Sequence, residues 1–422
     1  MQVFKFGGAS VKDAQSIQKV AEIIKSHQNE KTLVVVSAMG KTTDLLVSIV
    51  KNFYNGKGEP LSELSSIKQG FEDVLSSLFP AGHAVFDEVF NSFIEAEWIL
   101  EDPLADSYDY LYDQIVCIGE LISSRILAAY LNLNGIKAQW IDARDFIITD
   151  DTHREANVNW EATEQRIKGQ LPKLIDQYTL VTQGFIASTT ENHTTTLGRD
   201  GSDYSAAIFA ACQDASQVTI WKDVPGVLNA DPKWFNDTEL IEELSYSDAI
   251  ELTYYGANVI HPKTIKPLQN KQIPLFVKSF LEPQEKGTVI RATKLKLPVP
   301  SFIFKVNQIL LHIQPKDFSF ILEDNLSHIF RLCYEHRIKI NMMHNTAINF
   351  AISLDDTGEN VCNLIETLEK RYCIHTVSDL ELITIRYYNQ ETIERVLVDK
   401  EIIKELKDSY TCQMLVQKKR EL

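Results

Sequence analysis

Short apolar runs alternate with longer amphipathic segments over the first 280 residues of the chain. Several of these runs are rich in β-branched residues, as is typical of buried parallel strands. The predicted strands are 3–6, 32–37, 139–141, 179–182, 217–221 and 274–277. The intervening segments carry apolar residues at helical spacing, and residues 62–134 read as helical apart from breaks at Phe79-Pro80 and Asp102-Pro103. The alternation predicts an α/β fold with a mostly parallel sheet between two helical layers.

The pattern changes near residue 281. A proline-containing stretch over 291–304 reads as a linker. A β-α-β-β-α-β pattern follows over 305–388 and predicts a ferredoxin-like α+β domain, whose second helix is expected to run from Val361 to Tyr372. Residues 389–422 contain a predicted helix at 391–406 and a last strand at 412–416. This tail is expected to form part of a second such unit.

The charge balance narrows the possible partners. The 422 residues include 58 acidic and 42 basic side chains, which gives a formal net charge of −16. Binding to nucleic acid or to an anionic membrane through a generally basic surface is therefore not expected. No cysteine lies in a C-x-x-C pair, and the N-terminus lacks an apolar secretion segment. The apolar stretch 115–133 is interrupted by Glu120 and Arg125, so a cytoplasmic protein is expected.

Two glycine-containing loops follow the first two predicted strands. The first, Lys5 to Ser10, carries Gly7 and Gly8, which allow backbone N–H groups to approach a phosphate closely. Lys5 could neutralise charge on a transferring phosphoryl group. The second loop, Ser37 to Asp44, has small and hydroxyl residues that suit a polar ligand or a helix cap equally well.

Two later loops carry a denser set of anion-binding residues. In the segment Thr194 to Tyr204, Arg199 could bind a carboxylate or phosphate, and Ser202 begins a helix. Asp203 could orient Lys5 or meet a metal–phosphate complex. Trp221 to Lys233 has a glycine and two lysines after a strand, which suits a nucleotide or a plain turn.

Glu120 lies in an otherwise apolar helical stretch and therefore needs a partner. A substrate ammonium group and the nearby Arg125 are the two alternatives.

Taken together, these segments resemble the aspartate kinases of the amino acid kinase superfamily. The resemblance spans residues 1 to about 290. It rests on Lys5 to Val11, Ser37 to Asp44, Gly119 to Leu121, Val181 to Ile186, Thr195 to Asp203, Lys222 to Val227 and Gly256 to Pro262. The resemblance implies an amino acid kinase catalytic domain over 1–290 followed by an ACT-like regulatory domain over 305–388. A partial second ACT-like unit would occupy 389–422.

The resemblance also implies a reaction. ATP, with Mg²⁺, would phosphorylate the β-carboxylate of L-aspartate directly, as the first step toward lysine, threonine and methionine. The resemblance implies that Lys5 acts in catalysis and that Thr43, Glu120 and Arg199 bind aspartate. Residue chemistry adds Asp203 as the partner of Lys5 in the catalytic pair, and Ser202 to the aspartate site. The expected nucleotide site consists of Gly7, Gly8, Ser10, Lys222, Asp223 and Lys233. No protein-held metal site is predicted.

Some positions depart from the family pattern. Asp200 stands where a glycine is frequent, and Asn258 stands where some members have a lysine near ATP. An effector amino acid, with lysine as the first choice, is expected at Lys316 to Phe320 and Asn345 to Ala347. ACT pairing suggests a homodimer. The alternatives are a kinase acting on another acid or on a nucleoside monophosphate, and a catalytically silent amino-acid sensor.

Overall fold

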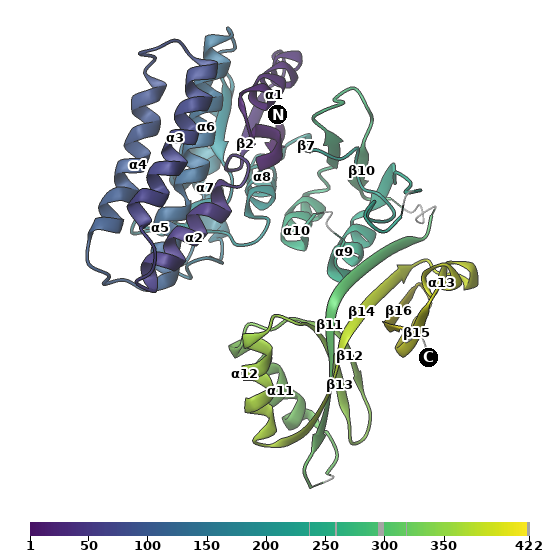
Figure 1. Cartoon of the computed structure of the whole chain (residues 1–422). Helices are drawn as coiled ribbons and strands as arrows, with labels where there is room; N and C mark the ends of the chain where they lie inside the picture. The colour runs from purple at the N-terminus through teal and green to yellow at the C-terminus, as the bar shows by residue number, and fades with distance from the viewer. Residues whose placement is uncertain (236, 258–259, 294–298, 318, 420–422) are drawn as a thin grey trace. The chain divides into compact units, whose positions relative to one another are not determined.

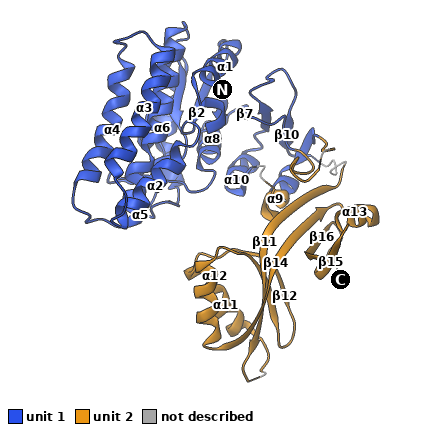
Figure 2. Cartoon of the chain, in the orientation of Figure 1, with its two compact units in different colours: residues 1–227, 240–250, 259–296 blue, residues 228–239, 251–258, 297–422 orange. Residues whose placement is uncertain are grey.

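The structure is a computed structural model of the chain. It describes all residues except 236, 258–259, 294–298, 318 and 420–422. By packing, the chain divides into two compact units (Figure 2). Unit 1 contains residues 1–227, 240–250 and 259–296, and unit 2 contains residues 228–239, 251–258 and 297–422.

Unit 1 contains, in its described residues, an eight-stranded sheet with the order β3-β4-β2-β1-β7-β9-β10-β8. The strands β3, β4, β2, β1, β7 and β9 run parallel, whereas β10 pairs antiparallel with β9. The predicted mostly parallel sheet is therefore confirmed. The bounds are β1 Gln2–Phe6, β2 Thr32–Val36, β3 Ala138–Trp140, β4 Thr179–Gln183, β7 Gln217–Lys222, β8 Glu243–Ser245, β9 Leu275–Ser279 and β10 Thr288–Arg291. A separate hairpin joins β5 (Ile186–Ser188) to β6 (Thr194–Thr196).

Helices cover both faces of this sheet (Figure 1). Side chains alternate between the faces of a strand, so Phe4 and Phe6 enter the core with α1 and α6, whereas Lys5 points to α8. The helices α3 and α4 extend the core on the side of α1 and α6. The bounds are α1 Ala14–Ser26, α2 Thr42–Tyr54, α3 Pro60–Leu78, α4 Val85–Glu101, α5 Tyr108–Val116, α6 Ile118–Leu133, α7 Trp160–Ile175, α8 Gly201–Cys212, α9 Tyr246–Tyr255 and α10 Pro262–Lys271.

The helical prediction for residues 62–134 is confirmed, with breaks at both predicted prolines. In the described part of the chain, the stretch Tyr108–Leu133 alone is long and apolar enough to cross a membrane by length and composition. However, 78% of its apolar window is buried inside the protein, because α5 and α6, which make up this stretch, contribute to the core of unit 1.

Unit 2 contains an antiparallel sheet with the order β12-β13-β11-β14-β16-β15. The strands β11 (Ser301–Pro315) and β14 (Tyr372–Arg386) pair with each other along most of their length, on both sides of a bulge near Asn307. The two predicted regulatory segments therefore share one continuous sheet. The other elements are α11 Glu323–Glu335, β12 Ile340–Asn345, β13 Phe350–Asp355, α12 Glu359–Glu369, α13 Gln390–Val396, β15 Lys400–Lys407 and β16 Thr411–Lys418.

Three local expectations differ from the structure of unit 2. The predicted helix at 391–406 is wrong, because α13 ends at Val396 and Asp399, with φ of 57°, turns the chain into β15. Tyr372 begins β14 rather than ending the preceding helix. Residues 301–304 of the expected linker form the start of β11, and residues 294–298 lie outside the described residues.

Candidate active site

The two N-terminal loops meet at the carboxyl ends of β1 and β2. The backbone N–H of Gly40 donates to the Gly8 carbonyl oxygen at 3.0 Å. A Cβ atom on Gly8 would lie 2.8 Å from the Ala38 carbonyl oxygen, so only glycine permits this approach. Ligands of parallel sheets bind at this end of the strands. The loop Lys5 to Ser10 (the phosphate loop) and the loop Ser37 to Asp44 (the substrate loop) therefore lie at the same edge of the sheet.

Lys5 and Asp203 form a buried ion pair across that edge. The Lys5 Nζ atom lies 2.7 Å from Asp203 Oδ1, and the two residues are 8% and 4% exposed. Burial favours the protonated acid, but the charges of Lys5 and Lys222 hold the pKa of Asp203 below its ordinary value. The charges of two lysines therefore act on this one buried carboxylate.

Glu120 is buried beside the substrate loop. Its Oε1 atom accepts the Ala38 N–H at 3.2 Å, while its buried Oε2 atom has no hydrogen-bond partner among the described residues. Burial raises the pKa of Glu120 to about 8, despite the Ala38 hydrogen bond and the charge of Lys5. The Arg125 alternative is wrong, since that guanidinium donates to Ser92 Oγ at 2.6 Å and lies over the Trp140 ring.

The start of α8 is packed tightly against the segment after β4. A Cβ atom on Gly184 would lie 2.5 Å from the Ser202 Cβ atom, so Gly184 leaves room for Ser202. Arg199 precedes this helix, and its side chain is 77% exposed, with Nε 3.8 Å from Asp200 Oδ2. Asp200 has φ of 55° and faces the surface.

The remaining predicted residues are less closely gathered. The buried Ser10 hydroxyl donates to the Trp221 carbonyl oxygen at 3.3 Å, and Thr43 lies in the first turn of α2. Lys222 ends β7, and the exposed Asp223 follows it. Lys233 is exposed and belongs to a segment of unit 2. Asn258 lies outside the described residues.

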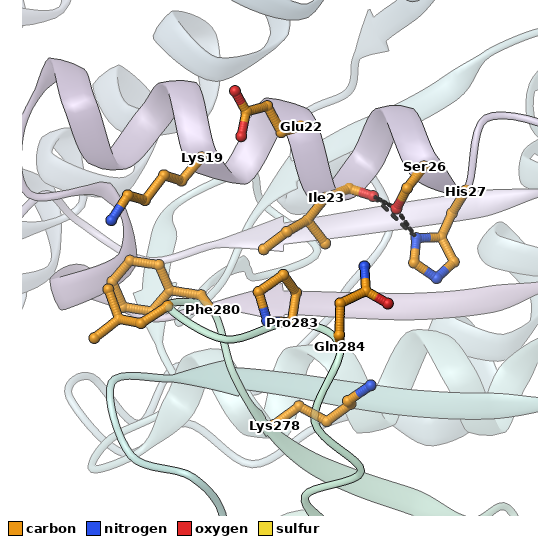
Figure 3. A pocket seen from close by; sticks show the side chains of 10 residues that line it. Lys19, Glu22, Ile23, Ser26, His27, Lys278, Phe280, Pro283 and Gln284 are labelled. Carbon is orange, nitrogen blue, oxygen red and sulfur yellow. Dashed lines mark hydrogen bonds between the residues drawn. The ribbon is translucent and has the colours of Figure 1, made fainter.

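Two adjoining pockets lie along α1, on unit 1. The first, of about 550 Å³, separates α1 from the segment after β9, and Lys19, His27, Lys278 and Pro283 are among the side chains around it (Figure 3). The second, of about 360 Å³, shares Lys19 and reaches Asp223. The second pocket therefore touches the predicted nucleotide site, whereas the described residues that line the first include none of the predicted site residues.

A buried carboxylate near this site and its histidine partner were not predicted from the sequence. Asp113, in α5, is fully buried and bonded to His153, 40 residues later. The sequence offered little signal for Asp113, because it stands just before the apolar stretch 115–133 among tyrosines and another aspartate.

The two segments predicted to bind an effector are adjacent in unit 2. Ile321, just after the first segment, donates its N–H to the Ala347 carbonyl oxygen at 2.9 Å. Phe318 of the first segment lies outside the described residues.

Comparison with known proteins identifies relatives over nearly the whole chain. The model of the amino acid kinase family matches residues 1–279. The lysine-sensitive aspartokinase 3 of Escherichia coli (strain K12) is 33% identical over 363 residues, which cover 84% of this chain and 78% of the relative. A bifunctional aspartokinase/homoserine dehydrogenase 2, chloroplastic, of Arabidopsis thaliana is 33% identical over 74% of this chain, but the match spans 35% of that relative.

A solved structure has the same fold. The crystal structure of E. coli aspartokinase III in complex with aspartate and ADP (R-state) matches with a TM-score of 0.84 and 28% identity, covering 99% of this chain and 96% of that chain. Both units therefore have counterparts in that structure.

Proposed function

The chain belongs to the amino acid kinase family, and from this premise we propose that it is an aspartate kinase. In the proposed reaction, ATP phosphorylates the β-carboxylate of L-aspartate and yields 4-phospho-L-aspartate and ADP. The observation that carries the proposal is the buried Glu120 Oε2 atom without a described partner, close to the Lys5–Asp203 ion pair. Relatives named aspartokinases support the choice of substrate.

The residues suit the charges of aspartate. Glu120 would accept the substrate ammonium group, which supplies the partner that a buried carboxylate needs. Arg199 would bind a substrate carboxylate in bidentate fashion. Thr43 and Ser202 would add hydroxyl and backbone donors at two helix starts.

The phosphoryl group would pass directly from ATP to the carboxylate. Lys5 would neutralise its negative charge in the transition state, and Asp203 would hold the Lys5 ammonium group in place. Backbone amides of Gly7, Gly8 and Ser10 would face the phosphates, and Lys222 and Asp223 would contact the nucleotide.

Mg²⁺ would arrive with the nucleotide. No group of three or more His, Cys, Asp or Glu side chains that could hold a metal ion occurs among the described residues. A magnesium ion usually takes one or two carboxylates together with substrate phosphates and water, and the exposed Asp223 is available for this. When bound, the ion would neutralise phosphate charge.

An assay with hydroxylamine tests the reaction. Incubation of the chain with ATP, Mg²⁺ and L-aspartate should yield aspartyl hydroxamate at about 1–100 turnovers per second, because hydroxylamine traps the acyl phosphate. ADP formation is measured in parallel with glutamate, acetylglutamate and UMP as acceptors, and Arg199→Ala serves as the impaired variant.

Two outcomes of this assay would contradict the proposal. Turnover with another acceptor but not with aspartate identifies a different amino acid kinase. Absence of turnover with every acceptor, together with tight amino-acid binding by calorimetry, identifies a sensor.

Feedback regulation by lysine is a second part of the proposal. The adjacent segments before Ile321 and around Ala347 are where the effector would bind in unit 2, and one relative is named lysine-sensitive. Millimolar lysine should lower the turnover and raise the melting temperature, because a ligand that binds the folded state stabilises it. Threonine and methionine at the same concentration are the controls. If lysine changes neither quantity, the proposed effector is wrong.

A cytoplasmic homodimer is the setting that fits this function. The six cysteines are free thiols, which suits a reducing compartment. The strand β12 lies at the edge of the unit 2 sheet, where a second copy could add its own edge strand.

A further inference from the structure

Asp113 is a fully buried carboxylate that the proposed chemistry does not use. Its Oδ1 atom accepts the Thr196 hydroxyl at 2.6 Å, and its Oδ2 atom contacts His153 Nδ1 at 2.8 Å. The backbone N–H of Arg154 donates to both oxygens at 3.1–3.2 Å. A buried charge is costly unless it is well bonded, and here donors from two separate segments satisfy the carboxylate.

These hydrogen bonds hold residues 153–156 beside β6 and the turn that follows it. Ala156 donates its N–H to the Thr196 carbonyl oxygen at 2.9 Å. A Cβ atom on Gly198 would lie 3.0 Å from Glu155 Cγ and 3.3 Å from the Arg154 carbonyl oxygen. Residues 153–156 therefore pack directly against the turn at Gly198, the residue that immediately precedes Arg199.

The backbone conformation of Arg154 is one that tertiary contacts must stabilise. Its φ is 70°, in the left-handed region, which costs of order 1 kcal/mol for a residue with a Cβ atom. The Asp113 carboxylate stabilises the conformation by accepting the backbone N–H of Arg154. The Arg154 guanidinium makes a separate hydrogen bond to Asp109 Oδ1 at 2.9 Å and lies over the Tyr108 and Tyr112 rings.

We propose that Asp113 is a positioning residue, which fixes the Thr196–Arg199 turn and thereby the place from which Arg199 reaches a substrate carboxylate. This inference rests on the proposed function, in which Arg199 binds aspartate. The Arg199 side chain is exposed, and an arginine side chain carries about 2 kcal/mol of rotamer entropy that it can lose when it binds a ligand. Because this cost already weakens binding, additional mobility of the Arg199 backbone would weaken the binding of aspartate further. Asp113 itself is not proposed to touch the substrate, because Thr196, His153 and the Arg154 N–H already occupy both of its oxygens.

The variant Asp113→Asn tests the proposal at nearly constant side-chain volume. The asparagine NH₂ group would face a hydrogen-bond donor at a position where the wild-type carboxylate oxygen accepts a hydrogen bond. We therefore expect the Thr196–Arg199 turn to become more mobile. KM for aspartate should rise by about 10–100-fold, while kcat and KM for ATP should change by less than about threefold. Thr196→Val, which removes one donor and keeps the shape, should change KM in the same direction by a smaller factor.

Asp109→Asn is the matched control. This carboxylate lies on the same helix and binds the Arg154 side chain rather than its backbone. Its KM for aspartate should stay within about threefold of the wild-type value, because the backbone hydrogen bonds to Asp113 remain.

Hydrogen exchange on the unliganded chain decides the inference independently of activity. Amides of residues 194–203 should exchange about 10-fold faster in Asp113→Asn, while those of α1 should stay unchanged. Unchanged exchange and unchanged KM in both variants would overturn the proposal, as would equal rises in both KM values with faster exchange throughout. If Asp113→Asn does not fold, Thr196→Val decides. If the wild-type chain does not phosphorylate aspartate, the proposed function fails, and exchange alone then tests the support of the turn.

Discussion

Lys5→Ala is expected to lower kcat by about 10²–10³-fold, with KM for aspartate changed by less than about threefold. The reason is that the Lys5 charge matters most when negative charge builds up on the transferring phosphoryl group, rather than when aspartate first binds. Steady-state kinetics with each substrate varied in turn separates kcat from the two KM values. A rise in KM for aspartate at unchanged kcat would contradict the role given to Lys5.

A stability control is needed for this variant, because Lys5 is the buried partner of Asp203. Removing one member of a buried ion pair leaves an unpaired charge and destabilises a protein by about 3–5 kcal/mol. Activity is therefore measured well below the melting temperature of the variant, and methylamine is added to restore a cation in the vacated space. Partial recovery of kcat by methylamine is expected. Lys25→Ala, at an exposed lysine in the last turn of α1, should leave kcat unchanged.

Glu120→Gln is expected to raise KM for aspartate by about 30-fold or more, because a buried charge pair with the substrate ammonium group is lost. KM for ATP should change far less. The glutamine keeps an oxygen for the Ala38 N–H, so the loop contact survives. Equal weakening of aspartate and ATP binding would count against the ammonium contact. Glu22→Gln, at an exposed carboxylate on α1, is the matched control.

The pH dependence sharpens this test. Since the Glu120 pKa is raised to about 8, the free protein holds this carboxyl group protonated at neutral pH. Only the ionised form can pair with an ammonium group, so KM for aspartate should fall as pH rises from 6 to 8.5. The glutamine variant should lack this dependence, and a parallel fall in both proteins would assign it to another group.

The same shift predicts an effect on stability with a defined sign. The folded pKa of Glu120 lies above its unfolded value of 4.5, so the folded state binds the extra proton and the wild-type protein loses stability as pH rises between these values. Relative to the wild type, Glu120→Gln should gain roughly 4 kcal/mol by pH 8.5 compared with pH 4.5. Denaturant unfolding at several pH values measures this difference.

The parallel sheet of unit 1 and the functional residues in the loops that follow its strands could be predicted from the sequence. Buried parallel strands such as β2 read as continuous apolar runs, so they are recognisable without partners. The helix predicted at 391–406 failed because Ile393, Val396 and Ile403 fit helical spacing and also fit a short helix followed by an edge strand. A left-handed residue, Asp399, separates the two, and no residue type there requires that turn.

Contacts between distant segments were beyond sequence reasoning. Arg125 seemed close to Glu120 along the chain, but residues five apart do not face each other on a helix, and the arginine reaches Ser92 on α4 instead. Asp113 finds Thr196, 83 residues later, only once the fold exists. Glycines and lysines in the loops were sufficient to locate the site in the sequence. The contacts that hold these loops in place, such as the one between Asp113 and Thr196, depend on tertiary packing.

The two long strands of unit 2 limit how far the C-terminus of the chain can be shortened. β11 pairs with β14 across both halves of the sheet, and β16 covers the edge of β14 from Glu381 to Arg386. Cutting the chain after residue 388 would bare this row of backbone groups together with the buried Ile383 and Ile385. The segment after residue 388 therefore cannot be removed without exposing part of the sheet. A shortened chain would need another strand or helix to pair with or cover the exposed edge of β14.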